Sequence, residues 1–179
     1  MSTSNIEIRP VRPEEMDEAG RVTANAYREF ATPGRDWESY LVRLADVADR
    51  SRRTEVLVAV EDGQVLGTVT LELTGRTDAG RGSQESAPLE PGQAHVRMLG
   101  VAPEARGRGV GRMLMEACLA EARRAGKAYL TLNTTERMRA ARAMYRSMGF
   151  TRMEDTVFPD GFVLLGYRIE LDGATPGDR

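Results

Sequence analysis

The sequence predicts an α/β or α+β fold, in which a mixed central sheet of about six to seven strands is flanked by four helices. Two observations lead to this prediction. Apolar residues recur with the 3.6-residue period of a helix in four segments, and short segments rich in valine and leucine read as strands. The predicted order is strand, two helices, three strands, helix, strand, helix and two strands. Because helices and strands are mixed along the chain, helices should cover both faces of the sheet.

The first predicted elements are a short strand and two helices. The strand covers residues 6–9, and Pro13 begins a helix with acidic residues in its favourable first turn. The sequence Thr-Pro-Gly at residues 32–34 ends this helix. A second helix follows, with an apolar face formed by Trp37, Leu41, Leu44 and Ala48.

A hairpin and a long loop come next. Residues 55–61 form a valine-rich strand, and Asp62-Gly63 is a strong signal for a two-residue hairpin turn. The returning strand alternates apolar and other residues over 65–73. Residues 74–93 are rich in Gly, Pro and Ser and have no period, so we expect a long loop that is functional or disordered.

The C-terminal half supplies the remaining strands and helices. The predicted elements are a strand at 94–101, a helix from Val110 to beyond Glu121, a strand at 128–133, a helix at 136–147, and strands at 150–153 and 162–171. We expect one domain over residues 5–171 and a disordered tail over 172–179.

Composition limits the function classes. The 179 residues are 41% apolar and 29% charged, which is typical of a globular domain. A net charge of -2 gives no general attraction to nucleic acid or to an anionic membrane. No apolar segment is long enough to span a bilayer, and the N-terminus lacks the pattern of a secretory signal. The single cysteine, Cys118, fits a reducing compartment, so we expect a cytoplasmic protein.

The strongest local signal is a turn rich in glycine and arginine between the strand at 94–101 and the following helix. Its glycines allow the backbone to approach a diphosphate, and the helix N-terminus offers unpaired amides. A dinucleotide fold would need Gly-x-Gly-x-x-Gly with a later acidic residue, and a Walker loop would need Gly-Lys-Ser/Thr, both of which are missing. The simpler alternative is a glycine-rich turn beside solvated arginines. The residues concerned are Arg106, Gly107, Arg108, Gly109, Gly111 and Arg112.

A second motif, A-x-x-x-Y-x-x-x-G-F at residues 141–150, accompanies this turn. With both motifs in this order, the chain resembles the GNAT superfamily of acetyltransferases over residues 5–171. The resemblance implies the GNAT fold, acetyl-CoA as acyl donor and no metal ion. Members bind acetyl-CoA where the strand ending near Val101 splays from the strand at 129–133. Superfamily members often form dimers, so a homodimer is one expected assembly.

The resemblance also implies roles for individual residues. The backbone at 99–101 would hold the pantetheine arm and stabilise the thioester oxygen, and the glycine-rich turn would hold the pyrophosphate. Met138 stands where many members have an asparagine, so Asn133 is expected to supply an amide instead. The implied cofactor-binding residues are Leu99, Gly100, Val101, Arg106, Gly107, Arg108, Gly109, Val110, Gly111, Arg112, Asn133, Arg142 and Tyr145.

Two residues are implied in proton transfer. Tyr145 would give its proton to the departing thiolate, unless it is only a core tyrosine on an apolar helix face. His95, the only histidine, replaces the glutamate of many members and would act as the base, directly or through water, unless it is a packed sheet residue. Cys118 is expected in the core, because direct transfer needs no acyl-enzyme.

The acceptor is expected to be the primary amine of a small molecule. An aromatic wall with a carboxylate suits a cationic amine, although such residues also occur in ordinary cores. The alternatives are a protein or peptide N-acetyltransferase, and an acyl-CoA-binding module without turnover. The candidate acceptor-binding residues are Tyr27, Phe30, Trp37, Glu72 and Phe162.

Overall fold

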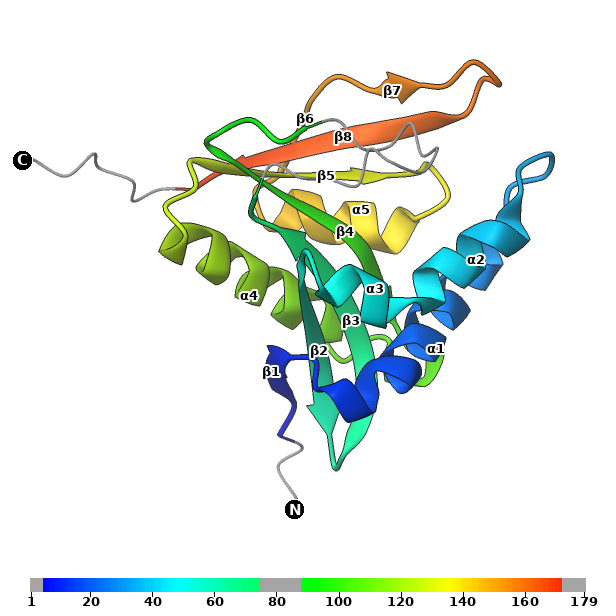
Figure 1. Ribbon diagram of the computed structural model, residues 1–179. Helices are drawn as coiled ribbons and strands as arrows, with labels where there is room; N and C mark the ends of the chain where they lie inside the picture. Colours follow the sequence, from blue (N-terminus) through cyan, green and yellow to red (C-terminus); the bar gives the residue numbers. More distant parts are fainter. Residues whose placement is uncertain (1–4, 75–87, 172–179) are drawn as a thin grey trace, which may run out of the picture. The chain divides into compact units, whose positions relative to one another are not determined.

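The computed structural model describes residues 5–74 and 88–171. It contains two compact units. The first comprises the described residues up to Leu71 together with Arg97–Ala117, and the second comprises those of Glu72–Val96 and from Cys118 onward. The strands follow the order β1-β2-β3-β4-β5-β8-β6, and β7 pairs with β8 (Figure 1). The predicted mixed α/β architecture is therefore confirmed.

The sheet of the first unit contains a hairpin. Its strands are β1 (Glu7–Pro10), β2 (Glu55–Glu61), β3 (Gln64–Glu72) and the second half of β4 (Gln93–Val101). β2 is antiparallel to both β1 and β3. Asp62 and Gly63 connect β2 to β3 with φ values of 49° and 79°, the left-handed conformations that a two-residue hairpin turn needs. The predicted turn is confirmed.

The helices of the first unit differ from the prediction in one respect. They are η1 (Pro13–Glu15), α1 (Met16–Tyr27), η2 (Arg28–Phe30), α2 (Trp37–Ala45) and α3 (Val47–Ser51). We expected a single helix where the structure has α2 and α3, and this prediction is wrong. Asp46 leaves the helical conformation, and its carboxylate accepts a hydrogen bond from the Asp49 amide at 2.9 Å. That hydrogen bond caps a new helix, so Ala48 is exposed and does not extend the apolar face of α2.

Close backbone contacts fix α1 within the first unit. A Cβ atom at Gly20 would lie 2.0 Å from the Ala45 carbonyl oxygen, so α1 and the end of α2 touch through their backbones. A Cβ at Gly100 would lie 3.0 Å from the Ala26 Cβ, so α1 also contacts the β4 backbone. Small residues are therefore required on this face of α1.

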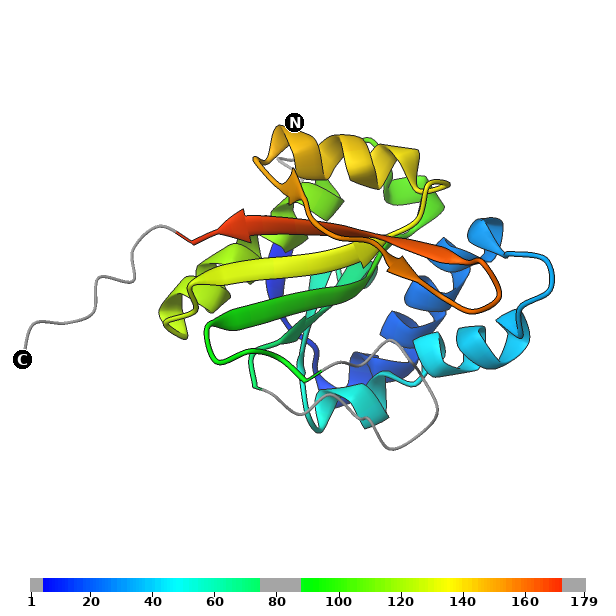
Figure 2. The same cartoon turned by 90° about the horizontal axis from the view of Figure 1, so that it is seen from above.

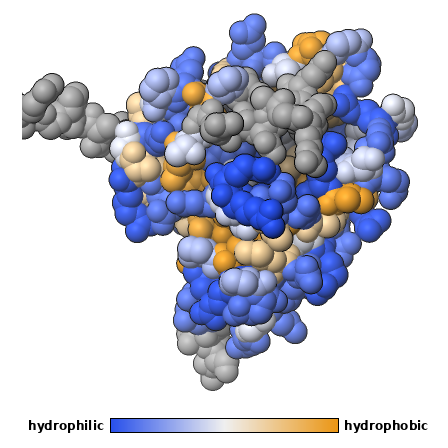
Figure 3. Space-filling model, in the orientation of Figure 1, coloured by the Kyte–Doolittle hydropathy of each residue, from blue (hydrophilic) through white to orange (hydrophobic). Residues whose placement is uncertain are grey.

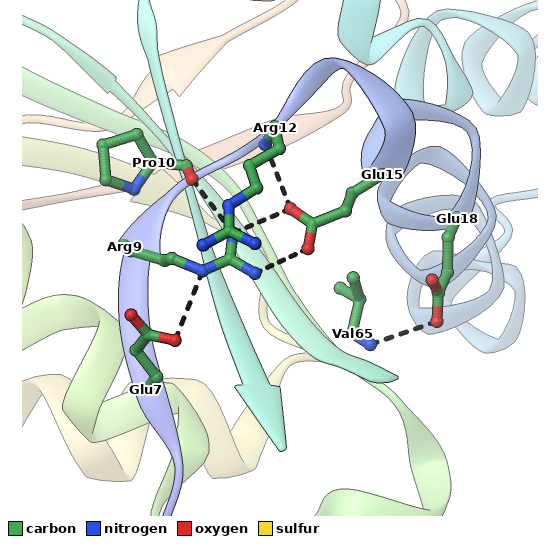
Figure 4. A network of polar contacts seen from close by, with 7 residues as sticks. All are labelled: Glu7, Arg9, Pro10, Arg12, Glu15, Glu18 and Val65. Atoms are coloured by element: carbon green, nitrogen blue, oxygen red, sulfur yellow. Dashed lines mark hydrogen bonds and ion pairs between the residues drawn. The ribbon is translucent and has the colours of Figure 1, made fainter. Parts of the chain in front are cut away.

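A polar network joins β1 to the start of the helical segment (Figure 4). The Arg9 guanidinium donates to both carboxylate oxygens of Glu15, at 2.7 and 2.6 Å. The same carboxylate accepts from the Arg12 amide at 3.0 Å, and the nearby Glu18 carboxylate accepts from the Val65 amide at 3.1 Å. Hydrogen bonds from Arg9, followed by that from the Arg12 amide, lower the pKa of Glu15 to about 2.

Replacing Glu15 with glutamine is expected to lower the free energy of unfolding at pH 7 by about 2 kcal/mol. We expect a smaller loss of stability than the full pKa shift of Glu15 implies, because the side chains of Arg9 and Glu15 both touch solvent. The ionised carboxylate stabilises the fold fully above its ordinary pKa of 4.5, and this contribution is lost as the pH falls towards 2. Urea denaturation at pH 7, 5, 4 and 3 should therefore show that the difference in free energy of unfolding between native protein and variant becomes smaller at low pH.

Glu14, an exposed residue of the same helical turn, provides the matched control. Glu14→Gln should change the free energy of unfolding by less than about 0.5 kcal/mol at every pH. A Glu15→Gln gap that stays constant down to pH 3 would contradict the assignment of this stability to the Arg9 ion pair.

The second unit is built on parallel and antiparallel pairings. The first half of β4 pairs in parallel with β5 (Tyr129–Thr134), from Gln93↔Tyr129 to Val96↔Leu132. β5 pairs antiparallel with β8 (Val163–Glu170). Helix α5 (Arg139–Ser147) runs along one face of β5 and β8 (Figure 2). The later residues of α4 (Val110–Arg124) also belong to this unit.

The last strands are shorter and more numerous than predicted. β6 (Thr151–Arg152) and β7 (Thr156–Val157) both pair with β8, and β7 was missed because two residues give no detectable alternation. Gly166 allows this arrangement, since a Cβ there would lie 2.6 Å from the Glu154 carbonyl oxygen.

After α4, the Lys127 ammonium donates to the Pro91 carbonyl oxygen at 3.4 Å.

Two expectations fall largely outside the described residues. These are the tail at 172–179 and most of the loop at 74–93, of which the described residues 88–92 contain no helix or strand. In the segments 5–74 and 88–171, no helix has the length and apolar character needed to cross a bilayer. The coloured surface in Figure 3 is mostly hydrophilic. Among the described residues, Val42, Met153 and Val157 are exposed large apolar side chains.

Candidate active site

The predicted phosphate-binding turn lies in the first unit between β4 and α4. η3 (Pro103–Ala105) follows β4, and α4 begins at Val110. Gly107 and Gly109 have φ values of 75° and 79°, a conformation that other residues rarely adopt. Apart from the glycine and its two chain neighbours, no atom of the described chain lies within 4 Å of a Cβ added at either position. The backbone conformation, and not local packing, therefore requires glycine here.

The first turn of α4 supplies hydrogen-bond donors. The Gly109 carbonyl accepts from the Met113 amide at 3.0 Å, which places Gly109 at the helix start. The amides of Val110, Gly111 and Arg112 follow, in positions where a helix has no internal acceptor for them. Such a helix start attracts anions. The geometry is thus suited to a diphosphate.

The arginines of the turn interact with carboxylates that the sequence did not indicate. Arg106 forms an ion pair with Glu29 at 2.5 Å, and Arg108 donates to both oxygens of Glu61 at 2.9 and 2.7 Å. The Arg108 hydrogen bonds lower the pKa of Glu61. Arg112 lies 4.0 Å from Glu116, one helical turn later. Glu29 and Glu61 come from distant parts of the sequence, so spacing within the motif could not reveal them.

A left-handed residue interrupts β4. Met98 has a φ of 56°, which is uncommon for a residue with a side chain. The pairing of β4 with β5 ends before it, at Val96↔Leu132. Beyond Met98, Leu99 and Val101 are half-buried, and Gly100 lies against α1. The backbone thus leaves the extended conformation at Met98, just before the groups predicted to contact the pantetheine arm.

His95 lies in the second unit, near the start of β4. Its side chain is 8% exposed, and Nδ1 is 2.7 Å from the Thr131 Oγ1 on β5. His95 and Thr131 are also cross-strand partners in the ladder. The imidazole is therefore held by a neutral hydroxyl, and Thr131 is a contact that sequence reasoning missed.

Tyr145 lies on α5 among aromatic side chains of the second unit. Its ring centroid is 5.7 Å from that of Phe150 and 6.0 Å from that of Tyr167. Burial, more than the neighbouring Cys118 and Tyr167, raises the pKa of the Tyr145 hydroxyl. The phenol therefore stays protonated at every ordinary working pH, as a proton donor must.

The two predicted proton-transfer residues approach the sheet of the second unit from opposite faces. Tyr145 packs on Tyr167, whose cross-strand partner is Leu132. His95 contacts Thr131, the residue before Leu132, and neighbouring residues of a strand point to opposite faces. In the predicted roles, the base and the acid would therefore lie on opposite faces of this sheet.

Three of the five predicted acceptor-binding residues come together in the first unit. The ring centroid of Tyr27 lies 6.5 Å from that of Phe30 and 6.2 Å from that of Tyr40. The ring centroids of Trp37 and Tyr40 are 5.2 Å apart. We call these four side chains the aromatic cluster. Tyr27, Trp37 and Tyr40 pack with Met98 of β4 around a buried core. Three members of the cluster therefore share their core with Met98, the residue before Leu99.

The other predicted residues belong to the second unit. Glu72 is buried at the end of β3, and Phe162 is half-buried against Phe158, with ring centroids 5.7 Å apart. Asn133 is exposed on β5. The Arg142 guanidinium donates to the Tyr167 hydroxyl at 3.5 Å and to the Glu136 carbonyl at 3.3 Å.

Comparison with known proteins identifies the family. The model of the Acetyltransferase (GNAT) family matches residues 21–150, which includes the glycine-rich turn and the Tyr145 motif. This chain belongs to the GNAT family of acetyltransferases. As a GNAT acetyltransferase it is an enzyme that takes its acetyl group from acetyl-CoA. A search of curated proteins found no match.

Solved structures share the fold of this GNAT acetyltransferase. A GNAT family acetyltransferase from Brucella melitensis, solved with acetyl-CoA, is 24% identical, with coverage of 98% of this chain and 94% of that chain and a TM-score of 0.63. The ribosomal-protein-S18-alanine N-acetyltransferase of Escherichia coli is 17% identical, with coverage of 98% and 99% and a TM-score of 0.67. An N-acetyltransferase from Staphylococcus aureus Mu50 is 17% identical, with coverage of 94% and 100% and a TM-score of 0.66.

Two further features bear on the chemistry of the GNAT acetyltransferase. Cys118 is fully buried, in agreement with a core position. Within the part of the chain that the structure describes, no three His, Cys, Asp or Glu side chains gather as a metal site would require.

Proposed function

We propose that this GNAT acetyltransferase moves the acetyl group of acetyl-CoA to the primary amine of a small molecule, by direct transfer while both substrates are bound. The observation that carries the proposal is the aromatic cluster, of which three members pack against the same buried core as Met98, the residue before Leu99. Amines arrive as ammonium ions, and the faces of Tyr and Trp rings attract cations. A small amine can lie against such a wall, whereas a peptide needs an open groove.

The donor-binding residues follow from the family and from the local geometry. The turn from Arg106 to Gly111, with the first amides of α4, would hold the pyrophosphate. Two left-handed glycines and a helix start fit that group. Because Arg106 and Arg108 already have carboxylate partners, we assign the main contacts to the backbone amides. The remaining candidates are Leu99, Gly100 and Val101 for the pantetheine arm, and Arg112, Asn133 and Arg142 for other polar groups.

The proposed chemistry moves two protons. Acetyl-CoA supplies an activated acetyl thioester. His95 takes one proton from the ammonium ion and later releases it to solvent, and the freed nitrogen bonds to the acetyl carbon as the carbon–sulfur bond breaks. The second proton that the nitrogen loses replaces the one that Tyr145 gives up. A backbone N–H in the segment 99–101 faces the thioester oxygen as it gains charge, and Tyr145 gives its proton to the leaving sulfur. Cys118 forms no acyl intermediate in this sequence of events.

Release of the CoA thiol from acetyl-CoA, measured against a panel of acceptors, tests the proposal. The panel contains aliphatic amines, aromatic amines, polyamines, amino-acid amides and short peptides, and the Cys118 thiol is subtracted. We expect release that depends on a small amine. Release with peptides alone would replace this proposal with a protein or peptide N-acetyltransferase. No release with any amine, despite measurable acetyl-CoA binding, would overturn the small-amine assignment.

A further inference from the structure

A chain of hydrogen bonds leads across the second unit to His95. The Glu90 amide donates to the Gln93 side-chain oxygen at 3.1 Å, and the Gln93 Nε2 donates to the Thr131 Oγ1 at 2.7 Å. The Thr131 Oγ1 contacts the His95 Nδ1 at 2.7 Å and the Ala94 carbonyl oxygen at 3.4 Å. Thr131 is 3% exposed, so water does not compete freely for its hydroxyl.

The first link fixes the orientation of the Gln93 amide. Because a backbone N–H can only donate, Gln93 must present its oxygen to Glu90 and its NH₂ group to Thr131. The Thr131 oxygen therefore accepts one hydrogen bond from Gln93. A hydroxyl has one proton to donate and two positions for accepting, so one donor and one acceptor position are left for His95 and Ala94.

One arrangement of protons gives each of these contacts of Thr131 both a donor and an acceptor. If Nδ1 carries the imidazole proton, it donates to Thr131, and the Thr131 proton is directed to the Ala94 carbonyl. If instead Thr131 donates to Nδ1, both Ala94 and Thr131 lack a proton for their contact. The first arrangement is favoured because it alone retains the contact of the buried Thr131 hydroxyl with the Ala94 carbonyl. The first arrangement also persists when the imidazole becomes charged, because both ring nitrogens then donate.

We propose that Thr131 and Gln93 are positioning residues that hold His95 in the tautomer with the proton on Nδ1, so that Nε2 is the nitrogen that gains and loses a proton. The tautomer of a histidine is set by the hydrogen bond of its other nitrogen, and here that partner is a hydroxyl whose own rotation Gln93 restricts. This inference rests on the proposed function, in which His95 is the general base.

The single histidine makes the tautomer directly measurable. The full chain is labelled with ¹⁵N-histidine, and the two ring nitrogen shifts are recorded at a pH where the imidazole is neutral. In the native protein we expect Nδ1 to show the shift of a protonated nitrogen and Nε2 that of an unprotonated one. Thr131→Ser retains the hydroxyl and should keep this pattern, whereas Thr131→Val should populate the other tautomer and lower kcat/KM by about 5-fold.

Gln93→Met is the second variant, in case the valine substitution disturbs folding. It leaves the Thr131 hydroxyl in place but removes its donor, so we expect a mixture of tautomers. A native spectrum with the proton on Nε2, or an unchanged spectrum in both Thr131→Val and Gln93→Met, would overturn the inference. The base role of His95 in the proposed function is tested separately, by the kcat/KM of His95→Gln. A native kcat/KM in that variant would rule out the base role, whereas the spectra of the native protein and of the other variants would still decide the tautomer.

Discussion

Tyr145→Phe is expected to lower kcat by about 100- to 10,000-fold, the usual contribution of a general acid. The phenylalanine ring keeps the contacts with Phe150 and Tyr167, so the packing of the second unit should survive. In the proposed role the hydroxyl acts only as sulfur departs, and therefore the dissociation constant of acetyl-CoA should stay near its native value. Thiol release under saturating substrates measures kcat, and a binding titration measures the dissociation constant.

Tyr167→Phe is the matched control for this prediction. Tyr167 is also buried in the second unit, and its hydroxyl accepts from Arg142. Its loss should change kcat by less than about 10-fold, the equivalent of one ordinary hydrogen bond. Equal losses in both variants would indicate a shared packing effect. A native kcat in Tyr145→Phe would show that another group protonates the sulfur.

Gly20→Ala is expected to lower the free energy of unfolding by about 3 kcal/mol, the upper range for overpacking. Helix propensity alone predicts the opposite, because alanine stabilises a helix interior by about 1 kcal/mol relative to glycine. The clash decides the sign, since the new Cβ would lie 2.0 Å from the Ala45 carbonyl oxygen. That oxygen belongs to the backbone at the end of α2, so it cannot rotate away as a side chain would.

Urea denaturation of Gly20→Ala and of Arg21→Ala tests this prediction. Arg21 is the exposed next residue of α1, and its replacement should change the free energy of unfolding by less than about 0.5 kcal/mol. A Gly20→Ala protein at least as stable as the native one would show that α1 and α2 separate at little cost.

Much of the fold was predictable because its elements have clear local patterns. The strand at residues 55–61 and the Asp62-Gly63 turn agree with the structure residue by residue. The break between α2 and α3 was not predictable in the same way. Trp37, Leu41 and Leu44 continue smoothly to Ala48 on a helical face, and only the capping contact of Asp46 interrupts them. A side-chain hydrogen bond there outweighs the apolar period.

In the candidate site too, local sequence motifs were predictable and contacts between distant residues were not. The glycine-rich turn and the Tyr145 motif are each a continuous stretch of sequence, so both could be found without a structure. The partners of the site residues are not contiguous. Thr131 lies 36 residues from His95, and Glu61 lies 47 residues from Arg108. Strand register brings the first pair together, and register depends on the whole sheet rather than on any local pattern.

Lys127 is the only lysine in the chain, and its ammonium contacts the Pro91 carbonyl oxygen. An enzyme that works in the presence of acetyl-CoA exposes its own side-chain amines to acetylation. Here a single side-chain amine is available for that self-modification, because the other cationic side chains are arginines, whose guanidinium stays charged. The charge of the protein should therefore change little during prolonged turnover, and the intact mass should rise by one side-chain acetyl group at most.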